Sequence, residues 1–267
     1  IDASGYAIEF DADDRASGSE SDGRSLWLGS DLVTAGALTL GLGIGHNSGS
    51  VDAGLYGSSD HDLTAIAIYG YGARGNLAYE GALVVGDGEI SGKRSTSLAS
   101  VTTLNEFTTS ARSATLSGKL GYRLSMARAI NVTTWLSGEL NYVSTDGYTE
   151  SGPSVTALTV ADDSYRTSEL GIGVEFDGRF REAGSWNLSL GATRAKTSDD
   201  NYARRAISLS GADWSASTPE FGLTTAYMSV GLASRVSENV LLQARLGATR
   251  ADGTTGRNAQ LRIDVNW

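Results

Sequence analysis

Strict alternation of apolar and polar residues is the feature that most constrains the fold of this chain. The last stretch, "AQLRIDVNW", alternates up to its final residue, Trp267. Successive side chains of a β-strand point to opposite faces, so a period of two indicates a strand with one apolar and one polar face. The chain therefore ends in a strand.

The same alternation recurs along the chain in twelve segments. These segments cover approximately residues 4–12, 24–33, 37–49, 61–73, 76–90, 111–125, 129–145, 164–181, 185–197, 219–236, 238–252 and 256–267. The segment 61–73 is the least clear, because "LTAIAIYGYG" is apolar on both faces. The pattern predicts an all-β fold in which residues 1–267 form a single domain.

Composition excludes several classes of protein. The formal net charge is −10, whereas nucleic-acid binding requires a basic face. The chain has no Cys, and we expect no metal site and no cofactor. Proline occurs twice and glycine 34 times, which suits long paired strands in a curved sheet.

The polar faces of these segments argue against a soluble barrel. They carry many charged residues, among them Lys119, Arg123 and Asp177. A closed sheet of about twelve strands has a lumen too wide for side chains to fill. We therefore predict an antiparallel 12-stranded transmembrane β-barrel with a polar lumen and an apolar outer face. The residues expected to face lipid are Leu26, Leu40, Leu136, Leu188, Val230, Leu246 and Ile263.

The connections between segments alternate in length. Tight turns such as "TAGA", "RGN" and "SEN" alternate with longer polar loops such as "STDGYTESGPSVTALTVADD". Short periplasmic turns and longer extracellular loops are typical of bacterial outer-membrane barrels, so we expect both termini to be periplasmic. Closure should pair Tyr6–Phe10 with Gln260–Trp267, since an open edge in lipid leaves backbone groups unsatisfied. Trp267 should lie at the membrane interface. As a terminal aromatic residue it also resembles the assembly signal of outer-membrane barrels, which implies that it helps to direct assembly.

Strand parity predicts a set of charged side chains that point into the lumen. So many charges would be costly in a dry core, so the lumen must be hydrated or occupied. The candidates for contact with an occupant are Glu9, Asp31, Glu139, Glu175, Arg179, Arg245 and Asp264.

Two other functions fit part of the sequence. A porin-like channel would share every feature of the barrel. A phospholipase would use His46 and Ser48, which share the outward face in "GIGHNSG", as general base and nucleophile. A lone His-x-Ser pair arises easily by chance, and His61 has no evident partner. We therefore predict that the protein is not an enzyme.

Several stretches resemble the translocator barrel of type V autotransporters. These are "LWLGSDLVTAGALTLGLGIGHNSGSVD", "TAIAIYGYGARGNLAYEGAL", "SGKLGYRL" and the run Gly147, Tyr148, Glu150 and Gly152 in "GYTESG". The resemblance implies a twelve-stranded outer-membrane barrel that anchors and secretes an N-terminal passenger domain to the cell surface. It also implies a helix in the pore before the first strand, most or all of which would precede Ile1. The implied partners are outer-membrane lipid, the passenger and pore helix, and the barrel assembly machinery, and the barrel should be monomeric.

Overall fold

A computed structural model describes most of the chain. The described residues are 1–12, 18–54, 57–98, 101–127, 130–153, 156–180, 184–197, 204–209, 212–217 and 224–266.

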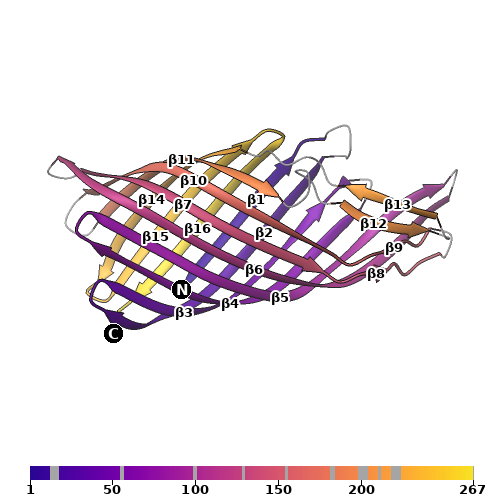
Figure 1. Cartoon of the computed structure of the whole chain (residues 1–267), viewed down its shortest axis with the longest axis horizontal. Coiled ribbons are helices and arrows are strands. Elements are labelled where there is room, and N and C mark those ends of the chain that lie inside the picture. The colour runs from indigo at the N-terminus through magenta and orange to yellow at the C-terminus, as the bar shows by residue number, and fades with distance from the viewer. Residues whose placement is uncertain are drawn as a thin grey trace.

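Twelve long strands close into one antiparallel barrel (Figure 1). In chain order they are β1 (Asp2–Phe10), β2 (Ser19–Ala35), β3 (Leu38–Asp52), β4 (Ser58–Arg74), β5 (Leu77–Leu98), β6 (Val101–Ala127), β7 (Ile130–Thr145), β10 (Asp163–Phe180), β11 (Gly184–Thr197), β14 (Thr224–Ser237), β15 (Val240–Ala251) and β16 (Thr254–Val265). Each pairs with its neighbours in sequence, and β1 pairs with β16. All twelve predicted segments correspond to these strands, so the predicted fold class is confirmed.

The two ends of the barrel differ. The N- and C-terminal residues lie at one end, called here the terminal end, where the Ile1 ammonium donates a 2.9 Å hydrogen bond to the Ile263 carbonyl (Figure 1). Tight turns join the strands there, and Gly36 and Gly75 occupy left-handed positions, both with φ of 61°. The longer connections lie at the opposite end, called the loop end.

The closing strands are those that the sequence predicts, in a different register. Tyr6 is opposite Asn258 and Phe10 is opposite Thr254, whereas Gln260 is opposite Ser4. Tyr6–Phe10 therefore pairs with residues 254–258, and the residues from Gln260 onward close against the start of β1. Trp267 lies outside the described residues.

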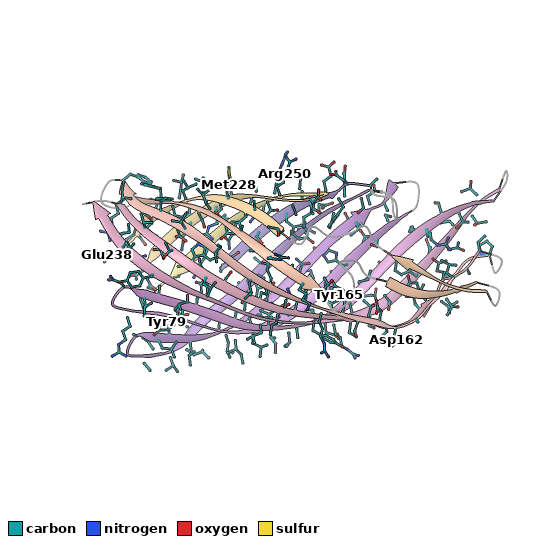
Figure 2. The ribbon with its side chains drawn as sticks, turned by 45° about the horizontal axis from the view of Figure 1, so that its top comes forward. Tyr79, Asp162, Tyr165, Met228, Glu238 and Arg250 are labelled. Carbon is teal, nitrogen blue, oxygen red and sulfur yellow. The ribbon has the colours of Figure 1, made fainter. Side chains whose placement is uncertain are left out.

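The outer face of the barrel is apolar. Leu170, Ile172 and Leu246 are 69%, 65% and 67% exposed, and Figure 2 shows Met228 projecting away from the wall. The seven residues predicted to face lipid all lie on this face. Five of them have large exposed side chains. The other two share the face of an exposed partner, since Leu188 is opposite Val230 and Ile263 is opposite Leu242. Within the described part of the chain, no helix has the length and apolar character needed to cross a bilayer.

Strands extend beyond the predicted ones at the loop end. Residues 91–98 and 101–110, which the sequence predicts to be loop, form the outer half of the β5–β6 hairpin (Figure 1). Four further strands form a separate sheet in the order β13-β12-β9-β8, with bounds Tyr148–Thr149 (β8), Thr159–Val160 (β9), Arg204–Leu209 (β12) and Ala212–Ser217 (β13). Polar sequences can continue a hairpin in water because each strand satisfies the backbone of the other, so loss of the apolar alternation does not end a strand.

Candidate functional site: the lumen wall

Aromatic rings lie over glycines on the inner wall. Directly opposite pairs are Tyr6 and Gly23, Trp27 and Gly45, Tyr69 and Gly41, Trp135 and Gly173, and Tyr227 and Gly191. A Cβ atom at any of these glycines would overlap the partner ring, so only glycine lets the ring lie flat on the wall. Trp135 and Tyr227 approach each other across two such glycines, with ring centroids 5.6 Å apart.

Carboxylates at the terminal end of the lumen accept several hydrogen bonds. Asp31 accepts from the Tyr69 hydroxyl at 3.0 Å and from the Tyr71 hydroxyl at 2.6 Å. Asp264 accepts from Arg262 Nε at 2.7 Å and from Gln243 Nε2 at 2.6 Å. These contacts hold the side chains against the wall and keep charge in the lumen.

Ion pairs cross the inner wall between β5, β6 and β10. Lys119 Nζ is 3.8 Å from Glu175 Oε2 and 3.9 Å from Glu80 Oε1, and it lies 5.2 Å from the Trp135 ring centroid. Arg123 Nη2 is 3.9 Å from Asp177 Oδ1. Distances near 4 Å between half-exposed groups indicate weak, hydrated pairs that an incoming chain could exchange.

Six of the seven predicted lumen residues lie on the polar inner face. They are Asp31, Glu139, Glu175, Arg179, Arg245 and Asp264, on β2, β7, β10, β15 and β16. Glu139 is directly opposite Glu169 and accepts a 2.6 Å hydrogen bond from Asn141. Among the described residues, the guanidinium groups of Arg179 and Arg245 have no ion-pair partner, so two cations remain available in the lumen.

The prediction that Glu9 points into the lumen is wrong. On β1, Ala3 is opposite Leu26 and Leu261, whose side chains are 49% and 46% exposed on the outer face. Directly opposite residues share a face, so Ala3 and Glu9 point outward. Tyr6, Ile8 and Phe10 therefore point inward. On β1 the large residues face the lumen, and the small Ala3 and Ala7 face lipid.

Tyr69 and Tyr71 are lumen residues that the sequence prediction missed. They lie in the segment 61–73, where both parities are apolar and the pattern gives no face. The available signal was the pairing partner, since Tyr69 lies opposite Gly41 in the neighbouring strand.

The Gly147–Gly152 run fastens a loop to the β5–β6 hairpin. Glu150 is 6% exposed, and its carboxylate pairs with the Arg94 guanidinium, with an Nε–Oε1 distance of 2.9 Å. The Tyr148 ring stacks on Phe107 with centroids 4.5 Å apart. This motif therefore shapes the loop end and not the lumen.

The proposed hydrolase pair is only partly assembled. His46 Nε2 is 3.4 Å from Asp62 Oδ2, as an orienting carboxylate would be. Ser48 Oγ, however, accepts a 3.3 Å hydrogen bond from Arg24 Nε, and within the described ranges no hydrogen bond joins it to His46. His61, for which the sequence offered no partner, is bonded through Nε2 to Asn47 Oδ1 at 2.8 Å inside the lumen. No three acidic or histidine residues among those described are placed to hold a metal ion.

A closed antiparallel barrel with an apolar outside and a charged, open inside defines an outer-membrane β-barrel protein. The chain belongs to the Autotransporter beta-domain family, whose sequence profile matches residues 1–247. No curated protein matches the chain.

Solved structures similar to this fold include three autotransporter barrels. The translocator domain of NalP from Neisseria meningitidis has a TM-score of 0.81 at 12% identity, covering 100% of this chain and 86% of that one. The beta domain of the Bordetella autotransporter BrkA has a TM-score of 0.68 at 14% identity, covering 99% and 98%. The transport unit of AIDA-I from Escherichia coli has a TM-score of 0.64 at 14% identity, covering 100% and 89%. At 12–14% identity the structural similarity shows only the fold, whereas the match to the family profile shows that the chain belongs to the family.

Proposed function

We propose that this barrel anchors in the bacterial outer membrane and secretes a passenger, joined to the N-terminal side of Ile1, to the cell surface. The observation that supports the proposal is that the charged lumen opens at the terminal end, where Ile1 lies. Ile1 is bonded to Ile263 at the terminal end, and charged side chains line the inner wall between this end and the loops. A chain entering beside Ile1 would meet polar groups and water, not a dry core.

The lumen would hold one helix or one extended chain. A twelve-stranded barrel has a lumen about as wide as a helix, about 10–12 Å. The inward Asp31, Glu139, Glu175 and Asp264 could bind cations of the occupant, and Arg179 and Arg245 could bind its carboxylates. Mixed signs on the wall suit an occupant of mixed charge.

The proposed orientation has both termini in the periplasm and the long loops outside. Tight turns at the terminal end and the extended β5–β6 hairpin at the loop end support it, because outer-membrane barrels have short periplasmic and long external connections. We further propose that the barrel is monomeric and is inserted by the barrel assembly machinery, with Trp267 as part of the signal. Trp267 itself lies outside the described residues.

The test compares the 267-residue chain with a chain extended by about 30 native upstream residues, enough for a helix as long as the membrane is thick. The extended chain should conduct fewer ions in a planar bilayer and melt at a higher temperature, since a segment that binds only the folded barrel stabilises it. Equal conductance and equal melting would favour the simple channel instead.

We also propose that the barrel has no hydrolytic role. Ser48 lacks a hydrogen bond to His46, which supports this, and translocator domains of this family are transport units. Ser48→Ala should leave surface display of the passenger unchanged. Loss of a lipid-hydrolysing activity on that substitution would restore the phospholipase hypothesis.

A further inference from the structure

Three strands repeat one outward pattern at the loop-end border of the apolar band. The sequence "LGATR" occurs at 190–194 on β11 and again at 246–250 on β15, placing Leu, Ala and Arg in succession on the outer face. On β16 the same order runs in reverse from Leu261 through Ala259 to Arg257. Lys196 follows Arg194 on the same face.

The register brings these cations together. Arg194 is opposite Thr224 on β14, and Arg250 is opposite Ala226, the next outward residue of the same strand. Arg257, on β16, is opposite Ala248 of β15. Ala248 is the outward residue of β15 that precedes Arg250. Figure 2 shows Arg250 projecting away from the barrel, as Met228 does. Arg194, Lys196, Arg250 and Arg257 are called here the basic sector.

The basic sector is exposed and uncompensated. All four side chains are exposed, and among the described residues none has a carboxylate within ion-pair distance. On β1, Arg257 is opposite Ala7, and Glu9 is the next outward residue. Glu9 makes no ion pair with Arg257. Among the described residues, the sector thus retains a net positive charge in a chain whose net charge is −10.

The opposite side of the barrel has the reverse charge at the same border. Outward residues that follow the apolar band there are Asp60, Asp62, Asp87 and Glu89 on β4 and β5. The outward Arg112 is neutralised by Asp87, with Nε 3.3 Å from Oδ1. Anionic groups at this level should therefore gather on the β11–β16 side.

We propose that the basic sector is a docking surface for the phosphate groups of membrane lipids in the leaflet at the loop end, which is the outer leaflet in the orientation proposed above. The sector is continuous with the lipid-facing band formed by Met228, Leu246 and Leu261, so an acyl chain on that band places its headgroup at the arginines. Arginine matches phosphate in geometry as well as charge. The alanines at 192, 248 and 259 leave space for the long side chains to lie along the wall.

The experiment titrates the folded 267-residue barrel in detergent with diphosphoryl lipid A and counts bound lipid by native mass spectrometry. The variant Arg250→Gln with Arg257→Gln is compared with Lys93→Gln and Arg112→Gln. This control removes the same charge from two outward cations that Glu106 and Asp87 already neutralise. Heat-dependent gel mobility verifies that each variant is folded.

The sector variant should bind lipid A about 30-fold more weakly than the unmodified barrel. Each arginine near a membrane surface contributes about fivefold to the affinity, and two are removed. The control should stay within about twofold, as expected for exposed ion pairs. Equal affinities of the sector variant and the unmodified barrel would overturn the proposal, and so would an equal loss in the control. Displacement of the lipid by an equimolar amount of inorganic phosphate would also overturn it. Lipid binding does not depend on passenger transport, so this result is separate from the test of secretion.

Discussion

Tyr71 donates a 2.6 Å hydrogen bond to Asp31 from two strands away, across the glycine-rich inner face of β3. Tyr69 donates a second bond to the same carboxylate at 3.0 Å, with its ring lying over Gly41. One lumen carboxylate therefore joins β2 to β4 without help from their backbones.

Asp31→Asn should destabilise the barrel by about 1–2 kcal/mol. A hydrogen bond to a charged group contributes about 1.5–3 kcal/mol, and solvent exposure lowers that value here. Unfolding in urea would measure the change. Glu9→Gln removes the same charge from an outward carboxylate and should change the free energy of unfolding by less than about 0.5 kcal/mol. A larger effect at Glu9 than at Asp31 would contradict the register of β1.

Gly41→Ala should destabilise the barrel by about 1–3 kcal/mol, because the new Cβ would displace the Tyr69 ring. Thermal unfolding in detergent would detect the loss. Gly138→Ala is the matched control, since its Cβ would meet its nearest neighbour, Leu170, at an ordinary 3.7 Å. Similar effects at the two glycines would show that ring packing is not the cause.

Leu136→Arg should cost about 2–4 kcal/mol, as expected for a cation on the lipid side near the middle of the membrane. Leu136 is 54% exposed on the outer face. Ser137→Arg, one residue further along β7, points into the lumen and should cost much less, apart from repulsion by Lys119 opposite it. Refolding into vesicles would measure both, and equal costs would mean that the two faces are reversed.

Glu150→Gln should loosen the Gly147–Gly152 run and leave the barrel intact. Breaking a buried ion pair costs about 3 kcal/mol or more, which is about a 100-fold loss of amide protection. Hydrogen exchange followed over residues 146–153 would report it. Glu106→Gln, which breaks an exposed pair with Lys93, should change exchange only slightly. Unchanged protection after Glu150→Gln would mean that the stacking of Tyr148 on Phe107 holds the loop alone.

The alternation of residues by itself determined the number of barrel strands and, for six of the seven charged candidates, the face on which they lie. A period of two assigns each side chain to one of two faces, and a run of large aliphatic residues identifies the lipid side, as it does for Leu136 on β7. The tight turns further indicated that neighbours in sequence are neighbours in the sheet.

Only the tertiary structure decided the face of β1, the register of closure and the form of the loop end. On β1 the large residues Tyr6, Ile8 and Phe10 occupy the lumen and Ala3 faces lipid, because pairing with β2 and β16 fixes the face of every residue at once. A short strand whose two faces are both partly apolar contains no signal that outweighs its neighbours. The outer half of the β5–β6 hairpin is held by pairing of polar segments that show no apolar alternation. The buried pair of Arg94 with Glu150 joins residues 56 positions apart, a contact that local periodicity does not encode.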